Sequence, residues 1–177
     1  MKILDATCGF KGIWYQKNHP FVTFMDKRSG KFRFTDTNNY TAFNDRTYKV
    51  NPDVVSTWEN APFPDNYFDM IVFDPPHLII DRNKKPPAMT QAYGYLFSDN
   101  WRMELKNGLK KLFELLKPEG IFILKWCENS VKVDEIIKLV PYPPLFGSNT
   151  KSKGHTANFW IVFLKYDVNM KLDKIQT

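Results

Sequence analysis

Apolar runs alternate with polar, turn-rich segments along the whole chain, and this alternation predicts an α/β fold. The run at 70–73 has four apolar residues in succession, which is typical of a strand covered on both faces within a parallel sheet. Other segments predict further strands at 2–5, 21–26, 53–58 and 121–126. Together these runs predict a mostly parallel sheet.

Helical periodicity is clearest after Ser98-Asp99-Asn100, three residue types that commonly cap helix N-termini. Apolar residues then recur on one helical face, at Leu105, Leu109, Leu112, Phe113 and Leu116. This helix is expected to stop at 117–120, which contains a proline and a glycine. A second helix is expected over 130–139, and a short one through Ile13, Trp14 and Tyr15.

The last two predicted strands, one beginning near Leu145 and one at 159–164, are joined by a polar loop without a helix. We therefore expect an antiparallel hairpin at the edge of the sheet. Residues 1–166 are then a single Rossmann-like, doubly wound domain, and 167–177 are expected to form a frayed tail. Residues 78–98 are expected to be a loop without secondary structure, mobile without substrate, that serves as a lid or binding loop.

Composition favours a globular protein, because 43% of the 177 residues are hydrophobic and 25% are charged. No apolar run approaches the roughly 18 residues that a membrane span needs. No signal peptide is evident at the N-terminus, so we expect a cytoplasmic protein. Cys8 and Cys127 lack the spacing of metal ligands or of a disulfide framework. The net charge of +6 is compatible with a polyanionic partner.

The apolar run at 70–73 ends in Asp74-Pro75-Pro76-His77. Each proline fixes φ and lacks an N–H, so the chain leaves the strand in a stiff, extended turn with unpaired carbonyls. The carboxyl ends of parallel strands are where open α/β folds bind ligands. This corner therefore predicts a rigid, acceptor-rich site for a planar amine. The alternative is a strand terminator with a solvated aspartate.

A glycine-containing turn follows the first predicted strand, in the sequence Asp5-Ala6-Thr7-Cys8-Gly9-Phe10-Lys11-Gly12. Small residues let a ligand approach the backbone closely. The turn lacks the glycine spacing of diphosphate binders, and Asp5 favours a ligand with a positive centre. Asp26, about 20 residues further on, stands where α/β nucleotide-binding units grip a ribose diol. The alternative for Asp26 is a capping or solvated residue.

Five segments in this order make the chain resemble the class I S-adenosylmethionine-dependent methyltransferases. They are 3–12, Asp26, 61–69, 74–77 and 116–120. The segment 74–77 resembles the (Asp/Asn)-Pro-Pro-aromatic motif of enzymes that methylate exocyclic or amide nitrogens. The motif order also resembles that of small methyltransferases of bacteriophages and integrated elements.

The resemblance implies S-adenosyl-L-methionine as the cofactor. The residues that it implies for cofactor binding are Asp5, Ala6, Thr7, Cys8, Gly9, Gly12, Asp26, Thr57, Trp58 and Asp74. The residues that it implies at the reacting centre are Asp74, Pro75, Pro76 and His77. Thr57 stands where the family usually carries an acid that meets adenine, and Trp58 or Glu59 would compensate. His77 stands where the family carries the aromatic residue that stacks on the substrate. The imidazole would either stack on the substrate in its place or change its protonation state near neutral pH.

The function that the resemblance implies is N-methylation of an exocyclic base amine in nucleic acid, with adenine in DNA favoured over RNA. Hydrogen bonds from the amine to the Asp74 carboxylate and the Pro75 carbonyl would favour a pyramidal nitrogen. The residues expected to contact phosphates are Lys84, Lys85, Lys151 and Lys153. Basic and aromatic residues also interleave over 27–51, either to bind nucleic acid or as an irregular excursion.

Two alternatives to base methylation stay open. One is methylation of glutamine or asparagine amides in proteins, which enzymes with an Asn-Pro-Pro-Tyr motif perform. The other is a catalytically inactive, cofactor-binding partner subunit, which the substitutions at Thr57 and His77 would favour. The chain has no room for a separate target-recognition domain, so a protein partner would be one source of sequence specificity.

Overall fold

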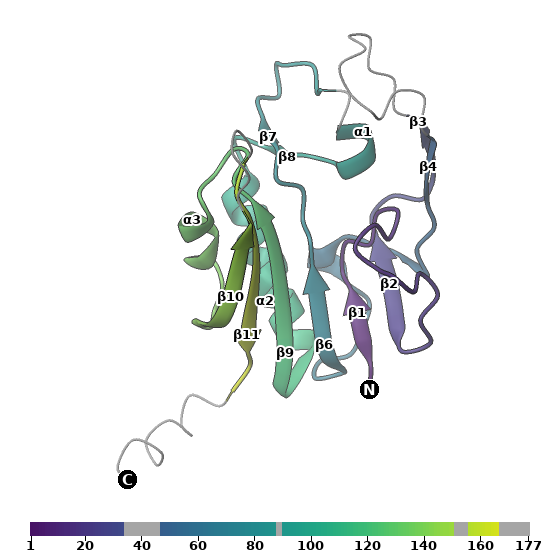
Figure 1. Cartoon of the computed structure of the whole chain (residues 1–177), viewed down its shortest axis with the longest axis vertical. Helices are drawn as coiled ribbons and strands as arrows, with labels where there is room; N and C mark the ends of the chain where they lie inside the picture. Colours follow the sequence, from purple (N-terminus) through teal and green to yellow (C-terminus); the bar gives the residue numbers. More distant parts are fainter. Residues whose placement is uncertain (34–46, 88–89, 151–155, 167–177) are drawn as a thin grey trace.

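The computed structural model describes residues 1–33, 47–87, 90–150 and 156–166. Within these residues, seven strands form one mixed sheet in the order β10-β11-β9-β6-β1-β2-β5 (Figure 1). The strands are β1 (Ile3–Asp5), β2 (Val22–Asp26), β5 (Val54–Val55), β6 (Phe68–Phe73), β9 (Leu116–Cys127), β10 (Pro144–Thr150) and β11 (Asn158–Leu164). The predicted strands are thus confirmed, although the third is only two residues long.

The strand order reverses between β1 and β6, as in doubly wound folds. β1 lies between β2 and β6 and is parallel to both, so that Asp5 is in register with Phe24 and Val72. β6 in turn is parallel to β9. The carboxyl ends of β1, β2 and β6 therefore meet at one edge of the sheet, hereafter the carboxyl edge, where such folds bind ligands.

The expected antiparallel hairpin at the sheet's edge is confirmed. β11 is antiparallel to both β9 and β10, and β10 is the outermost strand on that side. Lys151 and Lys153 come between β10 and β11 in the sequence and lie outside the described residues, as does the segment 167–177.

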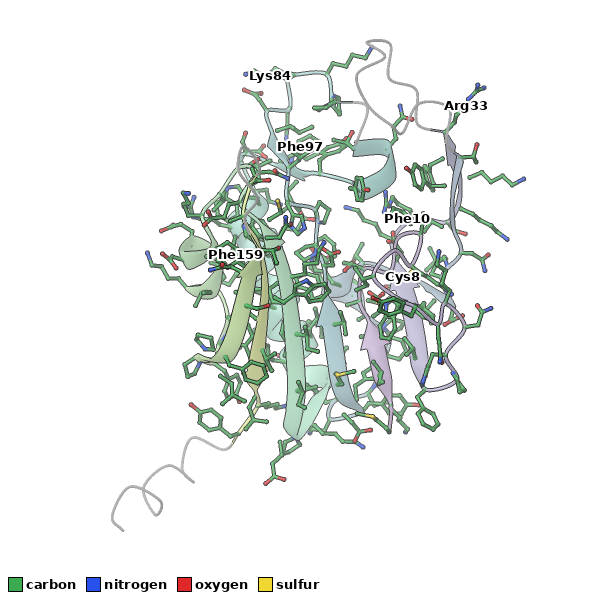
Figure 2. All side chains as sticks on the ribbon, viewed as in Figure 1. Cys8, Phe10, Arg33, Lys84, Phe97 and Phe159 are labelled. Atoms are coloured by element: carbon green, nitrogen blue, oxygen red, sulfur yellow. The ribbon has the colours of Figure 1, made fainter. Side chains whose placement is uncertain are left out.

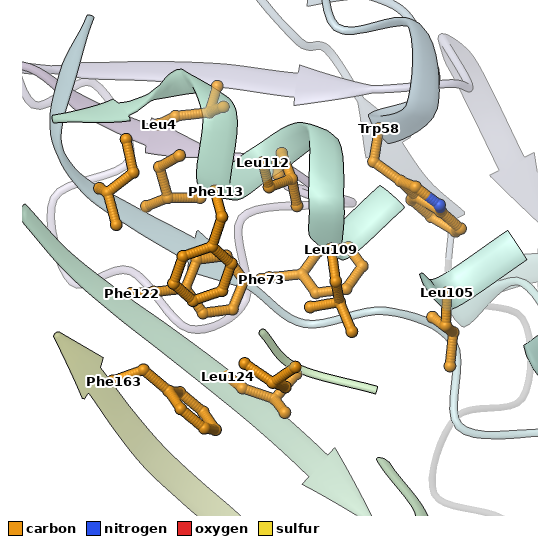
Figure 3. Packing of buried hydrophobic residues seen from close by; sticks show 14 of the residues in the cluster. Leu4, Trp58, Phe73, Leu105, Leu109, Leu112, Phe113, Phe122, Leu124 and Phe163 are labelled. Carbon is orange, nitrogen blue, oxygen red and sulfur yellow. The ribbon is translucent and has the colours of Figure 1, made fainter. Parts of the chain in front are cut away.

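One helix, α2 (Trp101–Leu115), supplies most of the cover for one face of the sheet. Its buried stripe includes Leu105, Leu109 and Leu112, which recur at helical spacing and are fully buried. They belong to the same core as Phe73 and Phe122 of β6 and β9 (Figure 3). Fully burying one such side chain contributes about 1.5–3 kcal/mol, so this stripe is the main reason why α2 docks on the sheet. A shorter helix, α3 (Val133–Ile137), also has its buried residues in this core.

The short helix expected through Ile13, Trp14 and Tyr15 is wrong, because a series of turns occupies this segment. Lys11 has a φ of 58°, which interrupts helical geometry. Trp14 instead packs edge-on against Phe24, with ring centroids 5.5 Å apart, and is a half-buried residue packed against the small core formed by Ile3, Cys8, Val22 and Phe24. The Trp14 indole thus packs on β2, where a helix was expected.

The segment 78–98 is also different from the expectation of a structureless loop. It contains β7 (Ile79–Ile80), α1 (Thr90–Tyr93) and β8 (Leu96–Phe97), and β7 pairs with β8 in parallel. Two apolar dipeptides pair here and bring the ends of the segment together. The mobility of this segment without substrate stays a prediction.

A second pair of short strands lies beyond the carboxyl edge, next to α1 (Figure 1). Here β3 (Gly30–Arg33) and β4 (Thr47–Val50) form an antiparallel pair. The part of the 27–51 stretch between them, 34–46, lies outside the described residues. In the parts of the chain that the structure describes, no helix is both long and apolar enough to cross a membrane.

Candidate active site

Asp74 follows β6 directly and lies at the carboxyl edge. Its two carboxylate oxygens contact two basic side chains: Oδ2 lies 2.8 Å from Lys125 Nζ, and Oδ1 lies 3.0 Å from His77 Nε2. Lys125 comes from β9, the neighbouring strand, whose Leu124 is in register with Phe73. Burial raises the pKa of Asp74, but the hydrogen bonds and charges of His77 and Lys125 outweigh it and hold that pKa below its usual range. Asp74 is therefore an anion at neutral pH.

A hydrogen bond joins the glycine turn (residues 6–12) to the Pro-Pro corner (residues 74–77). The backbone N–H of Asp74 donates to Thr7 Oγ1 over 2.9 Å. Next to this bond, the N–H of Ala6 donates to the carbonyl of Val72 over 2.9 Å. Two sequence motifs almost seventy positions apart are therefore held together at the point where the strand order reverses.

Asp5 is buried behind the glycine turn, with 1% of its surface exposed. Its carboxylate accepts hydrogen bonds from Trp14 Nε1 over 2.6 Å and from the Thr7 N–H over 3.1 Å. Burial raises the pKa of Asp5 to about 7 against these hydrogen bonds, and the charges of Asp74 and Asp26 add to the shift. Three carboxyl groups thus gather at the carboxyl edge, and a cationic ligand would offset their repulsion.

Asp26, at the tip of β2, already accepts hydrogen bonds from the protein. Its Oδ2 accepts the Gly9 N–H over 2.9 Å, and its Oδ1 accepts the backbone N–H and the Nε of Arg28, over 2.9 and 3.2 Å. Only 5% of Asp26 is exposed. The carboxylate therefore holds the glycine turn against β2, and a ribose diol would have to share or replace the bonds from Arg28.

Within the glycine turn, Gly9 is the residue with open space beside it. Its φ is +50°, and an added Cβ would meet nothing closer than Arg28 Nη2 at 3.9 Å. Gly12 differs, because a Cβ there would lie 2.6 Å from the Phe10 ring. Cys8 and Ala6 are buried, and burial raises the pKa of the Cys8 thiol. A ligand at this turn would therefore lie against the backbone around Gly9, and Gly12 makes room for Phe10.

Thr57 and Trp58 begin a short 3₁₀ helix, η1 (Trp58–Asn60), after β5. Trp58 is 3% exposed, with its ring 5.5 Å from that of Phe73, and it also lies against Gly108 of α2. This places the indole in the core below the sheet, and not as a free face at the carboxyl edge. Thr57 is half-buried, and its Oγ1 accepts a hydrogen bond from Asn60 Nδ2 over 3.1 Å.

His77 does not present an open ring face. Its side chain is 14% exposed, and its ring meets that of Trp126 edge-on, with centroids 5.0 Å apart. Since Nε2 faces the Asp74 carboxylate, this nitrogen carries a proton. Nδ1 is buried and has no hydrogen-bond partner among the described residues. His77 is therefore a partner of Asp74, on the side of the corner that faces Trp126.

Sequence reasoning missed Lys125 as a member of this cluster. The one available signal was a lysine within the otherwise apolar run at 121–126, since a charge in a central strand needs a partner. Arg28 was also missed, although its Nη1 donates to the Gln91 carbonyl of α1 over 3.4 Å. The signal at Lys125 does not identify Asp74 as its partner, and nothing in the local sequence indicates the contact of Arg28 with Gln91.

No family model matches this sequence, and no curated protein is detectably similar to it. Solved structures do share its fold. An S-adenosylmethionine-dependent methyltransferase from Methanosarcina mazei aligns with a TM-score of 0.55 and 14% identity, over 93% of this chain and 92% of that one. The 1,6-didemethyltoxoflavin-N1-methyltransferase of Burkholderia thailandensis, solved with S-adenosylhomocysteine, aligns with a TM-score of 0.53 and 14% identity, over 93% and 71%.

The [4+2]-cyclase SpnF aligns equally well, with a TM-score of 0.55 and 10% identity over 93% of this chain and 74% of that one. The chain therefore has the class I methyltransferase fold, as its strand order indicates. Because a cyclase has this architecture too, the fold alone leaves the activity open, and the function has to be argued from the site.

Proposed function

We propose that this protein is an S-adenosylmethionine-dependent N-methyltransferase that acts on an exocyclic amine of a nucleic-acid base, with adenine in DNA favoured. One observation carries the proposal: the Asp74 N–H donates to Thr7 Oγ1, which couples the acceptor-rich corner to the glycine turn. In this fold a cofactor held by the turn and an amine held by the corner would face each other across that bond.

The residues at the carboxyl edge fit a cationic cofactor. S-adenosylmethionine carries a sulfonium and an ammonium group, and both charges would be favoured near Asp5, Asp26 and Asp74. The backbone at Gly9 has open space for close approach. Asp26 would hold the ribose end after exchanging its bonds from Arg28. The cofactor, when bound, supplies an activated methyl group.

The chain's own contribution is to orient the attacking nitrogen and to stabilise its developing charge. Lys125 and His77 fix the Asp74 carboxylate, and each oxygen keeps a second lone pair for an N–H of the substrate. The Pro75 carbonyl is the second acceptor in the proposal. Because its pKa lies below the usual range, Asp74 is a poor base. It acts as an electrostatic partner, and the methylated product loses its proton afterwards.

The charge distribution supports a polyanionic substrate. Lys31 and Arg33 of β3 and Lys84 and Lys85 after β7 are exposed. Figure 2 shows Arg33 and Lys84 beyond the carboxyl ends of the strands, the end at which β6 leads into the Pro-Pro corner (Figure 1). Phosphate contacts at these residues would position a strand over Asp74. Methylation of protein amides lacks this support.

A second candidate is a non-catalytic, cofactor-binding partner subunit, and one observation favours it. Both oxygens of Asp74 already contact basic side chains, so an incoming amine has to share them. In this alternative the cluster of Asp74, His77 and Lys125 serves only to stabilise the corner. Cofactor would still bind, but no methyl group would be transferred.

Tritiated methyl transfer separates these functions. The purified protein is incubated with labelled S-adenosylmethionine and a panel of DNA, RNA and protein, and the labelled nucleoside or residue is then identified. The proposal expects label in a base amine, and strongly reduced incorporation of label with the Asp74→Ala variant. Label in glutamine or asparagine would show that the substrate is a protein amide and not a base. If calorimetry shows that the cofactor binds but no methyl group is transferred, the non-catalytic alternative is established. Absence of any heat with the cofactor would reject both.

A further inference from the structure

A base bound at Asp74 needs an apolar surface to stack on. Taking a base out of its stack costs a few kcal/mol of stacking free energy, and contacts in the site must compensate for this loss. The residue at position 77 does not supply that face. Its ring is mostly buried against Trp126 and its Nε2 points at Asp74. The stacking surface therefore has to come from another part of the chain.

Three aromatic residues from separate segments meet beyond the carboxyl edge. Phe10 of the glycine turn lies 4.8 Å from Tyr48 of β4 and 5.7 Å from Tyr93 of α1, measured between ring centroids. In Figure 2, Phe10 lies between the ends of β1 and β2 and the layer formed by β3 and α1. Phe10 and Tyr48 are half-buried, whereas Tyr93 is 48% exposed. Tyr93 is thus the member of this aromatic cluster that offers a free ring surface.

The C-terminal end of α1 lies close to the Pro-Pro corner. Gly94 follows Tyr93 with a φ of +75°, and a Cβ at Gly94 would lie 3.1 Å from the Pro76 ring. Arg28 reaches the other end of α1 through its bond to the Gln91 carbonyl. Tyr93 is therefore one residue from a close contact with Pro76, which itself lies two residues after Asp74. Burial, and secondarily Tyr48 and the charge of Asp74, raise the pKa of the Tyr93 hydroxyl.

We infer that Tyr93, supported by Phe10 and Tyr48, is the stacking platform for the planar ring of the substrate, in place of an aromatic residue at position 77. The inference rests on the proposed function and adds to it the residue that holds the base. The Phe10 ring contacts Tyr93 directly and is itself packed against Tyr48, and the close approach of Gly94 to Pro76 sets the distance of Tyr93 from the corner. Stacking accepts any base, so the choice of amine is left to Asp74 and the Pro75 carbonyl.

The test measures binding of a base, apart from catalysis. A labelled single-stranded oligodeoxynucleotide with one adenine among abasic positions is titrated by anisotropy into protein saturated with S-adenosylhomocysteine. A fully abasic oligonucleotide of the same length is titrated in parallel. The ratio of the two dissociation constants isolates the contribution of the base. Variants are Tyr93→Ala, Tyr93→Phe and, as a matched control, Tyr95→Ala, whose ring packs on Phe97 at 5.2 Å and not on Phe10.

Tyr93→Ala is expected to lower the adenine preference by about 5- to 150-fold, the range that corresponds to loss of one base–aromatic stack. Tyr93→Phe keeps the ring and should keep the preference, and Tyr95→Ala should leave it unchanged. Wild-type preference that survives in Tyr93→Ala would overturn the platform and leave the proposed function standing. A wild-type protein without any adenine preference would overturn base recognition itself and this inference with it.

Discussion

Asp5 and Asp74 show how their surroundings make two aspartates at the same edge chemically different. Both are withdrawn from solvent, which by itself raises the pKa of a carboxyl group. Asp74 has Lys125 and His77 beside it and stays anionic, whereas Asp5 accepts hydrogen bonds from two neutral donors, Trp14 and Thr7, and has a pKa of about 7. The first can serve as a fixed negative partner for an amine, and the second responds to the charge of a ligand.

Replacing Asp74 should affect turnover more than binding. Asp74→Ala removes an electrostatic partner that acts mainly as charge develops on the nitrogen, so kcat should fall by about 10²- to 10³-fold. The KM for the amine substrate should change much less than kcat. Asp74→Asn keeps one acceptor oxygen and should retain partial activity. Steady-state kinetics measure both, with Asp65→Ala as a control because Asp65 is exposed at the opposite edge.

Full activity of Asp74→Ala, with an unchanged circular dichroism spectrum, would contradict the mechanism. An equal loss of activity in Asp74→Ala and Asp65→Ala would attribute the effect to stability and not to the site.

Asp5 should make stability depend on pH in a defined window. Its pKa is 3.8 when unfolded and about 7 when folded, so the folded state binds the extra proton between these values. Stability should therefore fall as pH rises from about 4 to about 7, by at most about 4 kcal/mol for this residue, and then level off. Urea unfolding at a series of pH values measures this slope. The slope should be smaller in Asp5→Asn, and identical slopes in both proteins would refute the assignment.

Among the elements, α2 and η1 are packed more closely than the helix pattern suggests. Gly108 lies on the buried side of α2, and a Cβ there would lie 2.1 Å from Cδ1 of Trp58. The Trp58 ring is itself enclosed by Phe73 and cannot move easily. A glycine in mid-helix normally weakens a helix, so its presence here is explained by the close approach of the indole.

Gly108→Ala should therefore destabilise the protein by about 1–3 kcal/mol, as overpacking does, despite the better helix propensity of alanine. The matched control is Asn107→Ala, one position along the same helix and exposed, which should be neutral or slightly stabilising. Chemical denaturation of both variants decides between the two effects. If the Gly108→Ala variant is as stable as Asn107→Ala, the Trp58 side chain moves to accommodate the methyl group without a loss of stability.

The whole molecule has a net charge of +6, and part of this charge lies beyond the carboxyl edge. If Lys84 and Lys85 contact phosphates, log Kd for a single strand should depend on log salt concentration with a contribution of about 0.7 per contact. The double variant Lys84→Gln/Lys85→Gln should reduce the slope by roughly 1.4. Lys106→Gln/Lys110→Gln, two exposed lysines on α2, should leave it unchanged. Affinity that does not vary with salt would exclude nucleic acid as the partner.

Much of the architecture followed from local patterns. The apolar run at 70–73 predicted β6, the leucine spacing predicted α2, and the absence of a helix after position 145 predicted the β10–β11 hairpin. These predictions succeeded because burial imposes a period on each element that is visible within a few residues. The glycine turn and the Pro-Pro corner were also expected at one edge, since parallel strands bring their carboxyl ends together.

The contacts that give the site its chemistry were not visible in the chain order. Lys125 meets Asp74 across 51 positions, and Phe10 meets Tyr48 and Tyr93 from three different segments. Trp58 could have faced a ligand or the core, and the fit against Gly108 places it in the core. Such contacts depend on which side chains compete for the same space once the strands are assembled. A local sequence pattern does not show which distant residues will occupy that space.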